Sequence, residues 1–502
     1  MNAYERLMAA SKEARLAETS AAILNWDLET YMPPKGIRLR SEQLGYLSTV
    51  AHLAIARPEF GQLIEEAEKL ELDEVQRRNL YLFKREYAEK TSLPAELVGE
   101  HAKQQAVATE TWRRAKAAKD WSIFQPELQK MVDLSVRRAE LLMEPRGVKT
   151  VYDSMLDEYE RGMRADAVAR VFSELRTGLI PLVSKYADAS SKLDLGFINR
   201  RVPVETQRRM ALGLASFIQY DVKSSQAGGR IDEAEHPFTT GYFDDVRFTV
   251  HYHEDNVSSA IYAVLHEGGH ALYEQNLCHD WMYTPVGQAA SSGIHESMSR
   301  FVENIVGRSP EFWRYYYPHF CVTTDGFFSD ISPELMVLAS NIVRPSKIRV
   351  EADELTYSLH IIIRFEIERD LFSGKISVSE LPQAWNDKYE HYLGVEIEND
   401  SEGVMQDIHW SAGLFGYFPS YALGNVYDGM WLQKLDRDLP DWRASIEQGS
   451  FAPVKEWLIQ NVHRWASMYD PADLLKRTTG KSLTAKPFLA YLKDKYSAIF
   501  GV

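Results

Sequence analysis

"DNVSSAIYAVLHEGGHALYEQN", residues 255–276, decides how this chain folds around its chemistry. Apolar residues recur along it at helical spacing, and Asp255 or Asn256 is a candidate N-cap, so we predict a helix over most of the stretch. Residues four apart lie on one face of a helix. His266 and His270 can therefore present two imidazoles to one metal ion.

Glu267 follows the first histidine and lies about 100° further around the helix, so it cannot readily bind the same ion together with both imidazoles. It can instead act as general base on a water, which is the role of the glutamate in an H-E-x-x-H motif. A purely structural pair of histidines has the same spacing. A catalytic metal site therefore needs a third ligand elsewhere in the chain.

The third ligand has to come from a second segment. A metzincin would continue with glycine and a third histidine, but Tyr273 and Asn276 occupy those positions. "SSGIHESMSRFVENIVG" (291–307) predicts another helix, and the loop before it is long enough to fold this helix back against the first. Glu296 near its start is the best candidate ligand, and His295 is a weaker one.

Two adjacent glycines, Gly268 and Gly269, interrupt the metal-binding helix. Each costs about 0.5–1 kcal/mol relative to alanine inside a helix. Their missing side chains would let another element or a substrate backbone approach the metal. Close packing between two helices explains them equally well, so both interpretations stay open.

Helical periodicity dominates the rest of the chain, and strand signals are scarce. Amphipathic helices are predicted over residues 57–90, 123–143 and 164–190, with Pro181 expected to kink or end the last one. The best strand candidate, 245–252, alternates apolar and polar residues. Because it precedes the metal-binding helix, we expect it to act as an edge strand for an extended substrate.

Composition narrows the functional classes. The 502 residues are 45% hydrophobic and carry a formal net charge of −15, which disfavours nucleic acid and anionic membranes as partners. The N-terminus has no apolar signal region, and no apolar run is long enough to span a membrane. The two cysteines, Cys278 and Cys321, form no disulfide framework. We expect a cytoplasmic protein.

Several motifs in their order along the chain resemble one family, the carboxypeptidase Taq family of zinc-dependent metallocarboxypeptidases. The resemblance spans essentially the whole chain. It rests on the motifs at 25–43, 236–238, 245–249, 266–270, 295–300, 348–354, 403–410 and 413–425.

The resemblance implies a mostly α-helical protein: a single large helical fold with a deep groove and a small β-sheet next to the metal-binding helix, as in neurolysin and angiotensin-converting enzyme. We expect one domain over 1–502, in which helices of about 1–145 wall the groove and about 146–502 form the catalytic part. The family is typically homodimeric, binds zinc or cobalt, and releases C-terminal amino acids broadly but poorly at proline.

The resemblance also implies roles for residues outside the metal motif. Its oxyanion donors correspond to His409 and Tyr421, with Tyr417 as a competing tyrosine. The terminal carboxylate requires a cation, for which a guanidinium is best suited. The candidate substrate-binding residues are Arg349 first, then Arg247 and His236, together with Gln406.

One position departs from many glutamate-type zinc peptidases, which place an aspartate four residues after the ligand glutamate to orient a metal histidine. Arg300 stands there, as it does in the family that this chain resembles. The orienting carboxylate must therefore come from elsewhere, and Glu303 is the candidate.

Two other functions remain open. A metal-dependent oligopeptidase that cuts inside short peptides would use the same helix, and a helical peptide-binding protein could keep the motif without turnover. The presence of Glu267, three candidate ligands and both oxyanion donors favours the metallocarboxypeptidase.

Overall fold

The computed structural model describes residues 1–501, and these are mostly helical. The helices before the sheet are α1 (Ala3–Thr30), α2 (Ile37–Ala56), α3 (Pro58–Ala67), α4 (Glu74–Ser92), α5 (Ala95–Ala118), α6 (Trp121–Arg146), α7 (Val151–Tyr159), α8 (Ala165–Ser190) and α9 (Val204–Phe217).

The strands are β1 (Gly229–Glu233), β2 (Thr239–Tyr242) and β3 (Asp245–Val250). The helices after them are α10 (Val257–Gln275), α11 (Ser292–Arg300), the π-helical segment η4 (Phe301–Val306), α12 (Pro310–Thr323), α13 (Pro333–Ser340), α14 (Glu354–Phe372), α15 (Leu381–Leu393), α16 (Pro419–Asp438), α17 (Trp442–Glu447), α18 (Ala452–Asn461), α19 (Pro471–Thr479) and α20 (Lys486–Phe500).

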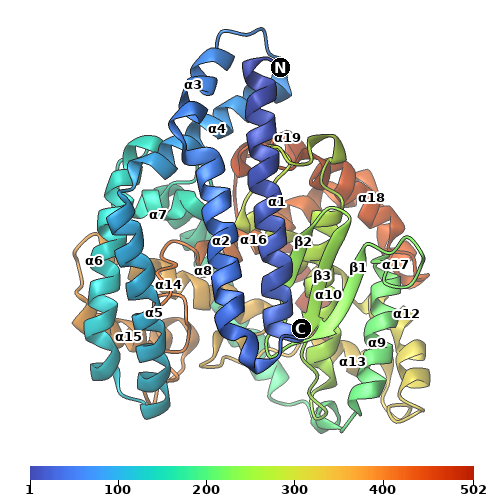
Figure 1. The fold of residues 1–502 in the computed structure, drawn as a ribbon. Helices are drawn as coiled ribbons and strands as arrows, with labels where there is room; N and C mark the ends of the chain where they lie inside the picture. The colour runs from blue at the N-terminus through green and yellow to red at the C-terminus, as the bar shows by residue number, and fades with distance from the viewer. Residues whose placement is uncertain (502) are drawn as a thin grey trace.

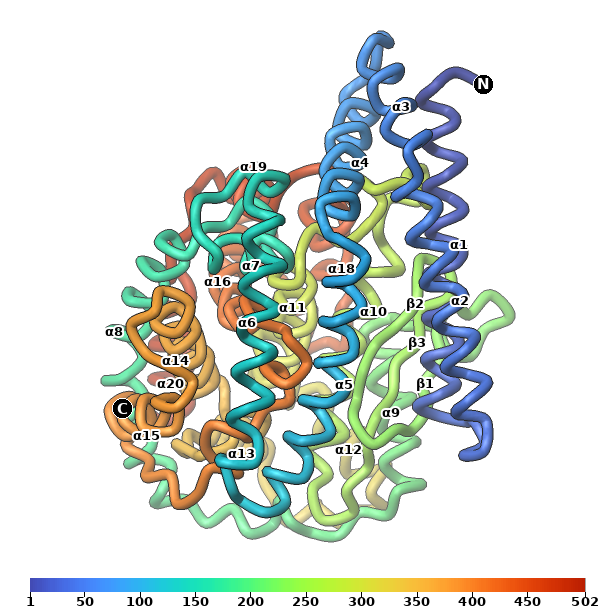
Figure 2. Tube along the Cα trace, turned by 60° about the vertical axis from the view of Figure 1, so that its left-hand side comes forward, coloured from blue at the N-terminus to red at the C-terminus, as the bar shows by residue number. Residues whose placement is uncertain are grey.

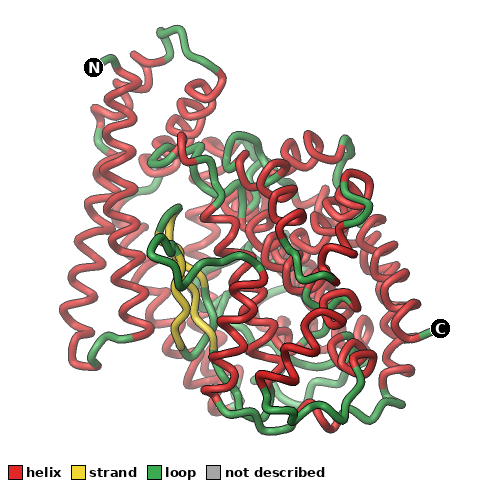
Figure 3. Tube along the Cα trace, turned by 90° about the vertical axis from the view of Figure 1, so that its right-hand side faces the viewer, coloured by secondary structure: helices red, strands yellow, loops and turns green. Residues whose placement is uncertain are grey.

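The small sheet lies beside the helix that carries the two histidines. α10 packs on β2 and β3, and α1 also contacts β2. Figures 1 and 2 show α1 and α2 as a long antiparallel pair next to this sheet, and in Figure 3 the strands lie between that pair and the helical body. The expected architecture, a large helical fold with a small sheet at the metal-binding helix, is confirmed.

The role expected for strand 245–252 is wrong in one respect. The strand order is β1-β3-β2, so β3 is central, parallel to β1 and antiparallel to β2. Its side chains Val246, Phe248 and Val250 are buried, as the alternation indicates. A strand with hydrogen-bonded neighbours on both sides has no free edge to offer a substrate. The strand next to the cavity described below is β2, which begins at Thr239.

Helix α8 runs through Pro181 rather than ending there. Proline removes one backbone hydrogen bond, but the residues on either side, Leu179 and Val183, are buried in the core. Tertiary packing therefore keeps α8 continuous in spite of the proline.

Two large hydrophobic cores and one small cluster, of Leu82, Val286 and Met468, organise the described residues. The main core runs from α5 to α20, whereas a separate cluster joins α1, α2, α3 and α4. The division into a walling part and a catalytic part near residue 145 stays a prediction. None of the helices in the described range, 1–501, has the length and apolar character that crossing a membrane requires.

Candidate metal centre

Helix α10 presents both histidines of the motif on one face. The Asn256 side chain caps it by accepting a hydrogen bond from the Ser259 backbone N–H, 3.3 Å away, and the helix continues to Gln275 as predicted. The rings of His266 and His270 lie 4.9 Å apart, centroid to centroid. One turn of regular helix therefore brings the two imidazoles together.

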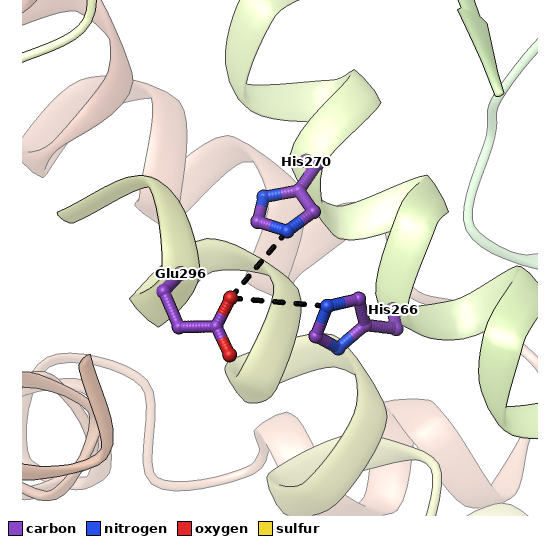
Figure 4. A group of neighbouring side chains, drawn as sticks. All are labelled: His266, His270 and Glu296. Atoms are coloured by element: carbon purple, nitrogen blue, oxygen red, sulfur yellow. Dashed lines mark ion pairs between the residues drawn. The ribbon is translucent and has the colours of Figure 1, made fainter. Parts of the chain in front are cut away.

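Helix α11 adds the carboxylate. Ser291 caps its N-terminus, and Glu296 lies one turn inside, with its Oε2 3.8 Å from Nε2 of His266 and 3.6 Å from Nε2 of His270 (Figure 4). A tetrahedral site with bonds of about 2.1 Å separates its donors by about 3.4 Å. Two imidazole nitrogens and one carboxylate oxygen at these distances fit such an ion and leave a fourth position for a reactant. It is the one such group found among residues 1–501.

The two glycines of α10 have different neighbours but the same explanation. A Cβ on Gly269 would lie 2.5 Å from the carbonyl oxygen of Met298 and 2.7 Å from Cα of Ser299, both in α11. A Cβ on Gly268 would lie 2.2 Å from Cδ1 of Ile218. Close packing, the second of the two open interpretations, therefore explains both glycines. At Gly269 it is also what brings Glu296 within reach of the histidines.

Glu303, the candidate for the orienting carboxylate, contacts His266. Its Oε2 lies 2.9 Å from Nδ1 of His266, and Arg300 and Arg308 pair with the same carboxylate. Burial alone would raise the pKa of Glu303, but these three partners hold it well below the ordinary value. Glu303 lies in the π-helical segment η4, and such segments are frequent at functional sites.

His270 has a different partner. Its Nδ1 lies 2.6 Å from Nδ1 of His295, and Nε2 of His295 lies 2.9 Å from Oε1 of Glu274. His295, which the sequence offered as a weaker ligand, thus contacts a candidate ligand instead of joining the group of three. Glu274 escaped the sequence analysis because a glutamate late in an amphipathic helix carries no distinguishing signal.

Glu267 points to the same region from α10. Its carboxylate accepts a hydrogen bond of 2.6 Å from the Thr239 hydroxyl at the start of β2. Burial raises the pKa of Glu267, opposed by the neighbouring His266 and by the Thr239 hydrogen bond. A carboxylate with a raised pKa, held by one donor, is suited to accept a proton near neutral pH. Thr239 was not found from sequence, since only the fold brings β2 to α10.

A cavity of about 910 Å³ opens over these residues. One side, the metal wall, is formed by α10 and α11 and presents His266, Glu267, His270 and Glu296. A second group of lining residues comes from the first part of the chain and is called the N-terminal wall here: it comprises Arg15, Leu82, Arg85, Glu86, Glu89, Arg146, Asp157, Glu158, Tyr159 and Arg161. Nothing in the sequence marks the residues of this second wall, because they come from four separate helices, α1, α4, α6 and α7, and from the segment that follows α7.

The predicted oxyanion donors are partly at the cavity. Tyr417 and Tyr421 line it, with ring centroids 5.2 Å apart. His409 lies behind them, with Nε2 3.2 Å from the Tyr421 hydroxyl. Burial lowers the pKa of His409 to about 4 and raises that of Tyr421 well above its ordinary value. Both groups are therefore neutral at pH 7, as hydrogen-bond donors to an oxyanion should be.

Arg349 and Gln406 form part of a buried network next to those donors. The guanidinium of Arg349 pairs with Asp407 at 2.9 Å and donates to the Tyr357 hydroxyl at 3.1 Å. It also lies over the ring of Tyr421, 5.0 Å from its centroid. The Gln406 side chain accepts from the backbone N–H of Arg349. Neither residue lines the cavity.

The remaining two candidates lie further out. Arg247 on β3 pairs with Asp245 at 2.7 Å and faces a smaller pocket beside α1. His236 is exposed, and its carbonyl oxygen accepts a hydrogen bond from the Thr249 hydroxyl. The residues just after it, Pro237, Phe238 and Thr239, line the main cavity.

Comparison with known proteins identifies related sequences over the whole length. Residues 6–496 match the model of the carboxypeptidase Taq (M32) metallopeptidase family. Thermostable carboxypeptidase 1 of Thermus thermophilus is 38% identical, covering 99% of both chains. Carboxypeptidase 1 of Bacillus subtilis is 39% identical over 96% of this chain and 95% of its own. The crystal structure of the M32 carboxypeptidase from Deinococcus radiodurans superposes with a TM-score of 0.95 at 34% identity, covering 100% of both chains.

Proposed function

The chain belongs to the carboxypeptidase Taq (M32) family and is a metallocarboxypeptidase that releases C-terminal residues from peptides, and we propose how its residues do so. His266, His270 and Glu296 hold the metal, with Glu267 as general base. The observation that carries this assignment is the convergence of the three ligands at one side of a cavity that Glu267 also lines.

We propose zinc as the metal, with cobalt as an alternative. Two imidazole nitrogens and one carboxylate oxygen, with an open fourth position, form the ligand set of many catalytic zinc sites. When bound, the metal supplies a Lewis acid that polarises the scissile carbonyl and lowers the pKa of a water.

Glu267 accepts the proton of the attacking water and delivers it to the leaving amine. The Thr239 hydroxyl donates a hydrogen bond to this carboxylate, which orients the carboxylate before a substrate binds. Tyr421, hydrogen-bonded to neutral His409, donates to the oxygen on which negative charge develops. Tyr417 lines the same part of the cavity and stays the competing donor.

Arg349 is the proposed reader of the terminal carboxylate, with Gln406 holding its backbone. One of its hydrogen bonds goes to the Tyr357 hydroxyl, and a substrate carboxylate could replace that partner at a gain in charge pairing. Arg247 and His236 rank behind it because Arg247 is paired with Asp245 beside a different pocket, and His236 is exposed. The size of the cavity favours broad specificity, and proline, whose φ angle is fixed, is expected to be cleaved poorly.

We also propose a homodimer. On α2, the apolar residues Leu39, Tyr46 and Leu53 are 61%, 70% and 56% exposed and repeat every seven residues, as at helix–helix seams. Leu53→Glu should convert a dimer to monomer in sedimentation velocity. The free cysteines are compatible with the cytoplasmic location that we expect.

The deciding experiment compares a free-acid peptide with its C-terminal amide twin by mass spectrometry, using metal-loaded protein. A ladder of single C-terminal losses from the acid, with the amide intact, supports the mechanism proposed for carboxylate recognition. Internal cuts in both twins would favour an oligopeptidase. No cleavage with metal bound would favour a peptide-binding protein.

A further inference from the structure

The two metal histidines are oriented by different devices. His266 meets the carboxylate of Glu303 directly, 2.9 Å from its Nδ1. His270 meets no carboxylate through its Nδ1; that atom lies 2.6 Å from Nδ1 of His295, and the carboxylate of Glu274 follows behind at 2.9 Å. Metal-bound histidines usually donate their second N–H to a carboxylate, a carbonyl or water. An imidazole in that position calls for an explanation.

The hydrogen-bond pattern permits one consistent assignment of protons for two neutral rings. Nε2 of His270 faces Glu296 in the candidate metal site, so this nitrogen carries the lone pair and Nδ1 carries the proton. Nδ1–H of His270 then donates to Nδ1 of His295, whose proton must lie on Nε2. Nε2–H of His295 in turn donates to Oε1 of Glu274. In this row of hydrogen bonds, each N–H of the two rings therefore meets an acceptor atom.

The three residues also close a ring between two helices. Glu274 follows His270 by four residues on α10, so both lie on one face, while His295 precedes the ligand Glu296 on α11. The ring of Tyr273, whose hydroxyl accepts from the Ala290 backbone N–H, packs edge-on against His295 at 5.3 Å. The hydrogen bonds therefore run from His270 on α10 to His295 on α11 and back to Glu274 on α10. The ring of Tyr273 packs against the middle residue of this row.

We propose that His295 and Glu274 are positioning residues that orient His270 for the metal through a histidine-to-carboxylate relay. The inference rests on the proposed ligand set of His266, His270 and Glu296. His295 extends the reach of Glu274 by one ring, fixes the tautomer of His270, and ties the helix that carries two ligands to the helix that carries the third. Both relay residues line the cavity, whereas Glu303 is sealed between arginines.

The test measures metal affinity by competition with a chromogenic chelator, using zinc, on folded protein. We expect His295→Ala to weaken zinc binding by about 10–100-fold, Glu274→Ala by a similar factor, and Glu274→Gln by less, because its amide oxygen still accepts the N–H. His295→Gln should recover part of the loss, since its side-chain oxygen can accept from Nδ1–H of His270. A merely structural role would not produce that recovery.

His279→Asn is the matched control, because His279 is an exposed histidine paired with Asp244, away from the metal site. Its zinc affinity should equal that of the wild type. Thermal unfolding of the metal-free variants establishes that they are folded. Zinc affinity of His295→Ala within twofold of the wild type would overturn the relay.

His266→Ala separates failure of the relay from failure of the ligand assignment. If His266→Ala loses zinc and His295→Ala does not, the relay is wrong and the metal site stands. If neither variant loses zinc, the proposed ligand set itself is wrong, and the relay falls with it.

Discussion

The metal wall and the N-terminal wall both hold charged side chains away from bulk water, but they pair those charges differently. On the metal wall, carboxylates face imidazoles: Glu296 faces both metal histidines, and Glu303, behind the wall, contacts His266. On the N-terminal wall, carboxylates face guanidinium groups from distant helices, as Asp157 faces Arg85.

This difference separates chemistry from shape. An imidazole can give up a proton or bind a metal, so the groups of the metal wall can act on a substrate. A guanidinium stays charged, so its ion pairs on the N-terminal wall neutralise each other and fix the geometry of the cavity. Changes to the metal wall should therefore alter turnover, and changes to the N-terminal wall should alter stability.

The largest effect is expected from Glu267→Gln. Loss of the general base should lower kcat/KM by about 10³-fold or more, since the amide of glutamine cannot accept the proton of the attacking water. Zinc affinity should stay at the wild-type value, because Glu267 is not one of the three ligands. Steady-state kinetics together with metal analysis checks both expectations, and a loss of less than tenfold would exclude Glu267 as the base.

On the N-terminal wall, Asp157→Ala should lower the stability of the protein and leave its turnover nearly unchanged. Asp157 is 1% exposed and accepts hydrogen bonds from Arg85, Arg164 and the Gly162 backbone. Breaking such a buried pair costs about 3–5 kcal/mol of unfolding free energy, because the arginines keep their charge. We expect kcat/KM of the folded variant to stay within tenfold of the wild type. Urea unfolding measures the loss of stability, and steady-state kinetics measures kcat/KM of the folded variant. A drop in kcat/KM of more than tenfold, with the free energy of unfolding close to that of the wild type, would contradict the contrast between the walls.

Glu160 links the two walls through pH. It follows α7, accepts hydrogen bonds from Tyr427 and from the Gly293 backbone at the start of α11, and burial raises its pKa to about 7. The native state then binds more protons than the unfolded chain between about pH 4.5 and 7. The contribution of Glu160 to the free energy of unfolding is therefore fully present below pH 4.5. This contribution, about 3 kcal/mol, is lost as the pH rises through 7.

Glu160→Gln should therefore unfold with a flatter pH dependence than the wild type between pH 5 and 8. The difference between the two curves isolates Glu160 from other titrating groups. Parallel curves from urea titrations would show that its pKa in the folded protein is ordinary.

The smallest effects distinguish a helix at the metal wall from a helix in the N-terminal region. Gly269→Ala should destabilise by about 1–3 kcal/mol, because the new methyl group meets the α11 backbone. Gly99→Ala in α5 should stabilise by about 0.4–1 kcal/mol, since nothing lies within 4 Å of its Cβ position. Thermal unfolding of both variants measures the pair, and the same sign for both would refute close packing as the reason for Gly269.

Much of the metal wall could be predicted from sequence because it depends on local geometry. Helical periodicity places His266 and His270 on one face and turns Glu267 away, and the capped helix after the loop offers Glu296. The helical class and the family follow in the same way from motifs that can be read along the chain. These inferences need only the pitch of a helix and the chemistry of each side chain.

Tertiary structure alone decided the rest. β3 is central and not at an edge, Arg349 is paired with Asp407, and Thr239 meets Glu267 across a gap of 28 residues. His295 faces His270 and not the metal position. Each of these outcomes depends on which distant segments pack together. Sequence periodicity constrains the direction in which a side chain points from its own element, but the partner that it meets depends on the packing of the whole core.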